Sequence, residues 1–279
     1  MNSTEINHLQ QTACQIRMKI IHGVFCAQSG HPGGSLSSAD IMTWLYAKEM
    51  KHDPKNPQDE NRDRFVLSKG HASPVLYATL AQFGYFPAEE IDKFRKTDGM
   101  LQGHPDMKGT PGVDMSTGSL GQGLSAACGM ALAAKKLGKS YRVYAVIGDG
   151  ECQEGQIWEA MMFAAKEKLD NLCVVLDYNG LQIDGPISQV GAPEPFDAKY
   201  EAFGWNVLKA SAHSFDELET AFGKARETAG KPTVIIARSV KGKGVSFMEN
   251  QYGWHGKAPN KEQYDQAMQE LNAELEGLK

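Results

Sequence analysis

Hard oxygen donors stand directly after two short apolar runs in the middle of the chain. Gly148-Asp149-Gly150 follows the run 143–147, and Asn179-Gly180 follows the run 172–176, thirty positions further on. A carboxylate, an amide oxygen and an exposed backbone carbonyl are ligands that Mg²⁺ prefers, and a few of them leave room for water and diphosphate oxygens. The segment from Ile147 to Gly185 is therefore predicted to be a metal-bridged diphosphate site.

The backbone around these donors also suits an anion. Glycines beside Asp149 let the main chain approach a ligand closely, and a helix beginning near Glu154 would point free amides toward it. Each motif alone is more typical of an ordinary tight turn. Their joint placement after two strands, with Ile183-Asp184-Gly185 following, favours the metal site over two unrelated turns.

Four of the eight histidines lie in loops that contain glycine or proline, and they are His31, His71, His104 and His255. Imidazole changes charge near neutral pH and can hydrogen-bond a hydroxyl in either form, so rigidly held loop histidines suit proton transfer. A zinc site is a competing interpretation, but these four lack ligand-like short spacing and an accompanying cysteine. Surface or capping roles explain the others, which are assigned no function. Those others are His8, His22, His52 and His213.

The elements that must position these residues alternate between short β-branched runs and helical periodicity. This alternation predicts an α/β fold, a mostly parallel sheet with helices on both faces. Strands are predicted at 64–67, 143–147, 172–176, 205–208 and 233–237. Helices are predicted at 5–28, 39–50, 121–138, 153–168, 196–203, 215–229 and 260–275, and the segment 29–34 is a breaker. Ligands of such sheets bind beyond the carboxyl ends of the strands, where both donor motifs fall.

The composition is that of an ordinary globular protein. The 279 residues, 41% hydrophobic and 23% charged, are interpreted as one domain, 1–279, with a long helical N-terminal segment. A net charge of -5 without a basic run argues against nucleic-acid or anionic-membrane partners. No apolar stretch approaches the roughly 20 residues that span a bilayer. The five scattered cysteines are interpreted as reduced thiols, and a cytoplasmic location is expected.

Three other patterns could be mistaken for sites. Residues 121–126 fit a relaxed dinucleotide-binding pattern, but no strand precedes them, so close helix packing is the better interpretation. Residues 241–244 follow a strand and could meet an anion, yet they lack nucleotide-binding spacing and favour a solvated or active-site-edge loop. The stripe of Trp158, Met161, Met162 and Phe163 is interpreted as core or subunit contact.

Taken together, Gly148-Asp149-Gly150 and Asn179 resemble the signature of thiamine diphosphate enzymes. The resemblance implies a thiamine-diphosphate-binding fold. It also implies that Asp149, the Asn179 side chain and the Leu181 carbonyl hold Mg²⁺, and that Gly150 and Asn179 lie against the cofactor.

The complete set of motifs resembles the transketolase family more specifically. The matching segments follow the family's order along nearly the whole chain, and they are Ser29–Gly33, Leu67–Ala72, Gly103–Pro105, Thr117–Gly121, the Asp149 and Asn179 pair, and His255-Gly256. Membership would imply transfer of a two-carbon ketol unit from a ketose, or its phosphate, to an aldose, or its phosphate. The thiazolium ring of the cofactor would act as the electron sink.

The same resemblance implies roles for individual residues. His31 and His255 would exchange the proton of the donor's C3 hydroxyl, and His104 would hold the C1 hydroxyl. His71 and His255 would contact the cofactor. Three residues would border the aminopyrimidine through backbone groups, and these are Gly118, Ser119 and Leu120.

Transketolases are normally more than twice as long as this chain, and parts of their active site belong to later domains. The resemblance therefore implies the N-terminal subunit of a split transketolase, inactive alone and completed by a separately encoded C-terminal subunit in an α2β2 heterotetramer. The family connects it with the pentose phosphate pathway. The alternatives are a ketol transferase for an unusual sugar, a deoxyxylulose-phosphate-synthase-like subunit, and a non-catalytic cofactor-binding assembly module.

Overall fold

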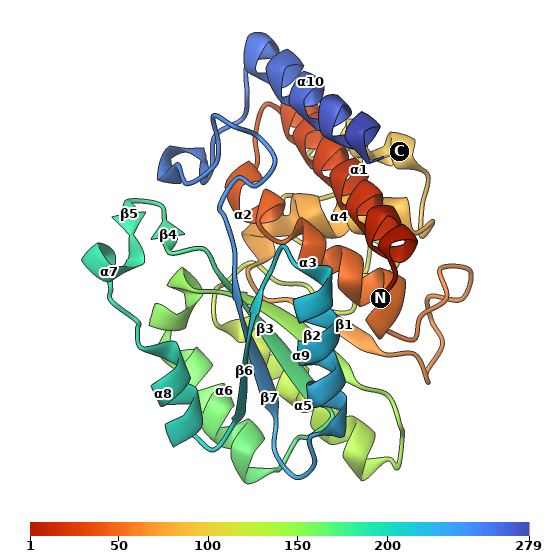
Figure 1. The fold of residues 1–279 in the computed structure, drawn as a ribbon. Helices are drawn as coiled ribbons and strands as arrows, with labels where there is room; N and C mark the ends of the chain where they lie inside the picture. Colours follow the sequence, from red (N-terminus) through yellow and green to blue (C-terminus); the bar gives the residue numbers. More distant parts are fainter. Residues whose placement is uncertain (279) are drawn as a thin grey trace.

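A five-stranded parallel sheet forms the centre of the computed structural model, which describes residues 1–278 (Figure 1). The strands lie in the order β1-β2-β3-β7-β6, and every neighbouring pair is parallel. Their bounds are β1 Arg64–Leu67, β2 Val143–Gly148, β3 Leu172–Tyr178, β6 Asn206–Ser211 and β7 Thr233–Arg238. All residues of β2 and β3 are buried. Continuous apolar, β-branched runs of this kind are typical of strands covered on both faces.

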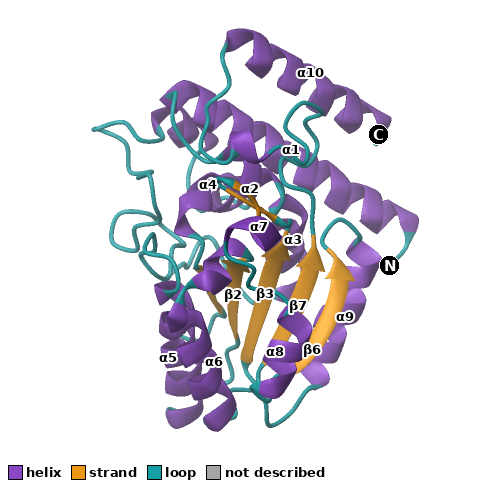
Figure 2. Cartoon of the chain, turned by 90° about the vertical axis from the view of Figure 1, so that its left-hand side faces the viewer, coloured by secondary structure: helices purple, strands orange, loops and turns teal. Residues whose placement is uncertain are grey.

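Helices cover both faces of the sheet, as the sequence predicts (Figure 2). Helices α5 (Gln122–Lys136), α6 (Gly155–Lys166) and α8 (Phe196–Ala202) enclose one apolar cluster. The second and larger cluster lies on the other side, and it is enclosed by α1 Ser3–Ala27, α3 Ala39–Trp44, α4 Ser73–Gln82, α9 Phe215–Glu227 and α10 Lys261–Gly277. The predicted α/β fold is therefore confirmed.

The first and last helices lie side by side at the edge of the molecule (Figures 1 and 2). Each begins with a capping box, Asn2 with Glu5 and Asn260 with Gln263, which satisfies free amides of the first turn. The Cys14 thiol donates across the contact to the Leu271 carbonyl at 3.1 Å. Within residues 1–278, no helix is both long and apolar enough to cross a lipid bilayer.

Several short elements depart from the sequence-based expectation. The predicted breaker 29–34 contains the start of a one-turn helix, α2 (Pro32–Leu36), and the predicted helix 39–50 changes from α3 to a π-helical turn at Leu45–Glu49. Helix α4 is not predicted at all. The remaining short elements are the hairpin of β4 Leu181–Gln182 and β5 Gly185–Pro186, α7 Ile187–Val190, and the 3-10 turns Gly70–Ala72, Ala88–Lys93, Gly150–Gln153 and Tyr252–Trp254.

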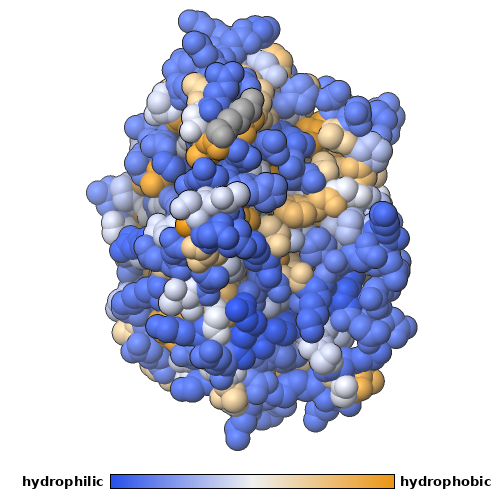
Figure 3. All heavy atoms as spheres, turned by 45° about the vertical axis from the view of Figure 1, so that its right-hand side comes forward, coloured by the Kyte–Doolittle hydropathy of each residue, from blue (hydrophilic) through white to orange (hydrophobic). Residues whose placement is uncertain are grey.

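The face shown in Figure 3 is mainly hydrophilic, with apolar residues in smaller groups. Of the predicted apolar stripe on α6, Met161 is fully buried, whereas Met162 and Phe163 are 53% and 39% exposed. Met161 therefore belongs to the core. Residues 121–126 allow the start of α5 to pack closely on its neighbours, because a Cβ at Gly123 would lie 2.6 Å from the Ser68 hydroxyl at the end of β1. This contact confirms the interpretation of the segment as close helix packing.

Candidate active site

A cavity of about 340 Å³ opens at the carboxyl ends of β2 and β3. Nine of the eleven residues singled out in the sequence line it, and they are His31, His71, Gly118, Leu120, Asp149, Gly150, Asn179, Leu181 and His255. Parallel strands end at the same edge of a sheet, so the loops after them bring together side chains that are far apart in the sequence. The remaining two, His104 and Ser119, are not among the lining residues.

Asp149 is the buried acid at the end of β2. Its Oδ1 accepts a hydrogen bond from the Gly150 amide at 2.8 Å, and its Oδ2 accepts one from the Gly180 amide at 2.5 Å. The bond from Gly180 joins the loops that follow β2 and β3. Burial and the neighbouring Asp177 raise the pKa of Asp149 to about 6. A buried carboxylate of this kind is stabilised by a nearby cation.

The other two predicted metal ligands follow β3. The Asn179 amide nitrogen lies 3.3 Å from an Asp177 oxygen, and its Oδ1 accepts from the Leu181 amide at 3.1 Å. The Leu181 carbonyl accepts from the Lys241 ammonium at 3.1 Å. Together with Asp149 this makes a set of hard oxygen donors on one cavity, which fits a magnesium ion with open positions for other oxygens.

Lys241 is one of two buried lysines that the sequence reasoning does not assign to the site. It is 2% exposed and lines the cavity, so the interpretation as a solvated loop is wrong and the active-site-edge alternative is the better one. Burial lowers the pKa of Lys241 to about 8. The Lys241 ammonium also lies 3.1 Å from Nδ1 of His255.

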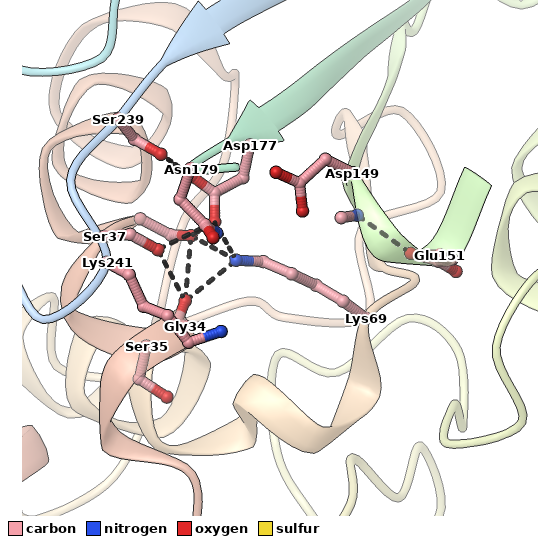
Figure 4. A network of polar contacts seen from close by, with 12 residues as sticks. Gly34, Ser35, Ser37, Lys69, Asp149, Glu151, Asp177, Asn179, Ser239 and Lys241 are labelled. Atoms are coloured by element: carbon pink, nitrogen blue, oxygen red, sulfur yellow. Dashed lines mark hydrogen bonds and ion pairs between the residues drawn. The ribbon is translucent and has the colours of Figure 1, made fainter. Parts of the chain in front are cut away.

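The second buried lysine, Lys69, anchors a network around Asp177 (Figure 4). Its ammonium donates to Asp177 Oδ2 at 2.5 Å, to the Ser38 hydroxyl at 2.6 Å and to the Gly34 carbonyl at 2.8 Å. Ser37 and Ser239 also donate to Asp177. Burial would raise the pKa of Asp177, but Lys69 and these hydroxyls hold it below its usual value. The network ties α2, the end of β1 and the end of β7 to β3.

Glu151 connects three loops on the opposite side of the cavity. It is 3% exposed, and it accepts from the Ser68 hydroxyl at 2.5 Å, the Gly121 amide at 2.9 Å and the Gly148 amide at 3.0 Å. Burial raises its pKa even though all three donors oppose the shift. Glu151 therefore fixes the loops that carry His71, Leu120 and Asp149 relative to one another.

Three of the four loop histidines form a triangle in the cavity. The ring centroids of His31 and His71 are 5.1 Å apart, those of His71 and His255 are 5.0 Å apart, and those of His31 and His255 are 5.4 Å apart. Burial lowers the pKa of His31 to about 4 and that of His255 to about 3, and it lowers the pKa of His71 as well. At neutral pH these three rings are uncharged, so each has one donor and one acceptor nitrogen.

His31 carries a further mark of a binding site. Its Nδ1 is buried and has no hydrogen-bond partner among residues 1–278. Buried polar atoms in native proteins are nearly always paired, so such an atom in a cavity indicates a missing ligand group.

His104 lies beside the cavity wall and not in it. Its side chain is exposed, and a Cβ added at Gly118 would lie 3.1 Å from its ring. Burial and Arg95 lower its pKa. The structure thus places His104 against the Gly118 backbone, beside the cavity that Gly118 lines.

The sequence of the chain matches a known family over almost its full length. Residues 9–276 match the model described as "Transketolase, thiamine diphosphate binding domain". The chain belongs to the transketolase family. The predicted family, the predicted transferase class and the thiamine diphosphate-binding fold are confirmed.

This transketolase chain is similar to two kinds of relative. It is 46% identical over 266 residues to the 6-deoxy-6-sulfo-D-fructose transketolase subunit of Clostridium sp., covering 95% of this chain and 97% of the relative. It is 38% identical over 274 residues to an apulose-4-phosphate transketolase subunit of Phocaeicola vulgatus, covering 98% and 97%. Human transketolase is 42% identical over 276 residues, but the match covers 99% of this chain and only 44% of the human protein.

Solved structures agree with this division. The transketolase of Campylobacter jejuni superposes with a TM-score of 0.91 at 34% identity, and the match covers 100% of this chain and 46% of that one. This chain therefore spans less than half of the human and Campylobacter transketolases. It spans nearly all of the related subunits from Clostridium and Phocaeicola.

The residues that sequence reasoning missed are Lys69, Glu151, Asp177 and Lys241. A signal was present for each, because all four stand in the first few positions around a strand end. Position after a strand end does not show that a lysine will be buried, since lysines are rarely buried in the protein interior without an ion-pair partner. The acid that pairs with Lys69 lies 108 positions away.

Proposed function

We propose that this chain is the N-terminal, diphosphate-binding subunit of a split transketolase, which transfers a two-carbon ketol unit from a ketose to an aldose with thiamine diphosphate and Mg²⁺. The observation that carries the proposal is a single cavity that holds the oxygen donors Asp149, Asn179 and Leu181 beside the triangle of His31, His71 and His255. A cofactor-binding module without activity would need the oxygen donors but not the uncharged histidines.

The Mg²⁺ ion and the diphosphate group of the cofactor are assigned to the loops that follow the strand ends. Asp149, the Asn179 side chain and the Leu181 carbonyl would hold Mg²⁺, and the buried carboxylate with its raised pKa supports this assignment. The Gly150 amide and His71 would contact the diphosphate. Backbone groups of the Gly118, Ser119 and Leu120 loop would border the aminopyrimidine. When bound, thiamine diphosphate supplies the electron sink that allows a carbon–carbon bond beside a carbonyl to break.

The histidines are assigned to proton transfer at the sugar. The Lys241 ammonium is a pure donor, so the Nδ1 of His255 that lies 3.1 Å from it must accept, and the ring proton then sits on Nε2. His255 would thus offer an N–H to a substrate oxygen. His31, which is uncharged and lines the same cavity, would accept the proton of the donor's C3 hydroxyl. His104, beside the cavity, would hold the C1 hydroxyl.

A partner subunit is part of the proposal. The two relatives that match this chain over 97% of their own length are both named as subunits. We infer an α2β2 assembly in the cytoplasm, with the active site completed by the C-terminal subunit.

The sugar is proposed at the level of its class. The Clostridium and Phocaeicola relatives are named for 6-deoxy-6-sulfo-D-fructose and for apulose-4-phosphate. By analogy, we propose that the ketose donor carries an acidic group, a phosphate or a sulfonate, on the carbon farthest from the transferred unit. The sugars named for these two relatives, and not the acidic group itself, favour an unusual sugar over a substrate of the pentose phosphate pathway.

The test is reconstitution of ketol transfer. The pure chain is assayed with Mg²⁺, thiamine diphosphate and a panel of ketose donors, first alone and then after co-expression with the product of the neighbouring reading frame. We expect no turnover alone and turnover in the co-expressed complex. Robust turnover by the pure chain would contradict the split-enzyme proposal.

A further inference from the structure

A second group of metal-ligating side chains lies far from the diphosphate cavity. His22 and Cys26 are one helical turn apart on α1, so they share a face. Asp92 reaches them from the 3-10 turn Ala88–Lys93. The His22 Nε2 is 2.7 Å from Asp92 Oδ1 and 3.6 Å from Cys26 Sγ, and all three ligand atoms lie within 4.8 Å of one another.

A glycine brings these elements together. A Cβ at Gly23 would lie 2.9 Å from Cγ2 of Ile91, which is closer than real contacts allow. Because position 23 has no side chain, the turn Ala88–Lys93 packs directly on α1. Asp92, the next residue after Ile91, is thereby held against His22.

We propose that His22, Cys26 and Asp92 form a binding site for a divalent transition-metal ion, with zinc as the ion that the ligand set fits best. Zinc takes nitrogen, thiolate and carboxylate ligands in tetrahedral sites, and it is often held by residues spaced by one helical turn. Binding releases the Cys26 thiol proton to solvent. The thiolate and the Asp92 carboxylate then balance the two positive charges of the ion.

The distances are close to those of a tetrahedral site. Zinc–sulfur and zinc–nitrogen bonds of about 2.3 and 2.0–2.1 Å separate the two ligand atoms by about 3.6 Å, and the Cys26 Sγ to His22 Nε2 distance is 3.6 Å. The Asp92 oxygen at 2.7 Å must withdraw by roughly half an ångström to share the ion. Its side chain is 59% exposed, so it is free to make this small movement.

Tyr264 on α10 orients the histidine. Its hydroxyl lies 3.1 Å from His22 Nδ1, and its ring stacks on Phe25 with centroids 4.2 Å apart. If Nδ1 donates its proton to this hydroxyl, Nε2 is left bare toward the metal, which is the arrangement that supports histidine ligands in metal sites. A cavity of about 610 Å³ adjoins His22 and Asp92 and leaves room for a water as fourth ligand.

The site is independent of the proposed transketolase chemistry. None of its residues lines the diphosphate cavity. An ion there would clip α1 to the turn Ala88–Lys93, and through Tyr264 it would engage α10. The sequence interpretation left His22 without a function because Asp92 is 70 positions away.

The experiment uses the purified full chain, stripped of metal with a chelator and titrated with Co²⁺ as a spectroscopic probe. Cobalt bound to a thiolate gives a charge-transfer band in the near ultraviolet, whereas cobalt held by oxygen donors in the diphosphate cavity does not. We expect one equivalent of Co²⁺ to produce this band and Zn²⁺ to remove it. The cobalt–thiolate band does not depend on transketolase activity, so it tests the metal site even if the chain takes no part in ketol transfer.

Variants distinguish the proposed metal ligands from the residues around them. Cys26→Ser and His22→Gln should abolish the band and weaken Zn²⁺ binding at least tenfold, while the matched helix variant His8→Gln should behave as wild type. Tyr264→Phe should keep the band but weaken Zn²⁺ binding by about tenfold. Circular dichroism confirms that each variant is folded. The proposal is overturned if the folded wild type gives no band, or if the band persists in Cys26→Ser.

Discussion

Replacing Lys69 with methionine should leave Asp177 as an uncompensated buried charge. Lys69 and Asp177 are 2% and 0% exposed, and their ion pair at 2.5 Å has almost no contact with water. Removing one partner of a buried pair costs about 3–5 kcal/mol, because the other charge stays desolvated. Ser37 and Ser239 still donate to Asp177, and Ser38 lies 3.3 Å from it, so we expect the lower end of this range.

The matched control is the same substitution at an open ion pair. Lys135 and Asp170 are 2.6 Å apart, but their side chains are 36% and 30% exposed. Lys135→Met should therefore cost only about 0–1 kcal/mol. The substitution is the same at both sites, and each lysine also donates to a backbone carbonyl, that of Gly34 for Lys69 and that of Lys168 for Lys135, so burial is the main difference between them.

Urea unfolding followed by far-ultraviolet circular dichroism at pH 7 measures both free energies of unfolding. A double variant, Lys69→Met with Asp177→Asn, should be more stable than the sum of the two single effects by about 1–3 kcal/mol, because it removes the stranded charge. If Lys69→Met costs no more than Lys135→Met, or if the effects of Lys69→Met and Asp177→Asn are simply additive, Asp177 is not a stranded buried charge in the Lys69→Met variant.

Three further predictions concern the cavity. In the assembled complex, His31→Gln and His255→Gln should lower turnover far more than thiamine diphosphate affinity, and the reverse pattern would make them binding residues. Because burial depresses the folded-state pKa of His31 to about 4, its contribution to stability is present above the unfolded pKa of about 6.5 and is lost as pH falls toward 4. His31→Gln should therefore lose less stability than wild type when urea unfolding is repeated between pH 7 and pH 4, and an unchanged slope would refute this. Glu151→Gln replaces one of the two accepting oxygens with an NH2 group, which then faces a donor such as the Gly148 amide, so it should reduce stability by about 1–3 kcal/mol; a loss below about 0.5 kcal/mol would show that Glu151 does not tie the loops together.

The strands and most helices could be predicted because their sequences carry clear signals. Strands β2 and β3 are short, mainly apolar runs, and α9 has a strongly amphipathic pattern. Helix α4 escaped prediction because every residue except its last is buried, so it has no polar face to reveal the helical period. Helix α2 begins inside the predicted breaker 29–34 and packs closely on a distant loop: a Cβ at Gly33 would lie 2.9 Å from the Trp254 carbonyl.

The site could be predicted where it depends on residues that follow the carboxyl ends of parallel strands. It could not be predicted where it depends on contacts between residues far apart in the sequence. Position after a strand end alone placed Asp149 and Asn179 on one cavity. The charge network around Lys69 was not predicted, because position after a strand end shows neither the burial of a lysine nor its ion-pair partner. The uncharged state of His31 and His255 follows from burial, which no spacing of residues expresses.

The most direct measurement is calorimetric titration of thiamine diphosphate into the assembled complex, with Mg²⁺ and then with a chelator, for wild type and Asp149→Ala. We predict binding to wild type with Mg²⁺, and its loss both on chelation and in the folded variant, because Asp149 is the charged ligand of the proposed metal site. Equal affinity of wild type and Asp149→Ala in the presence of Mg²⁺ would contradict the assignment of this cavity as a metal-bridged diphosphate site.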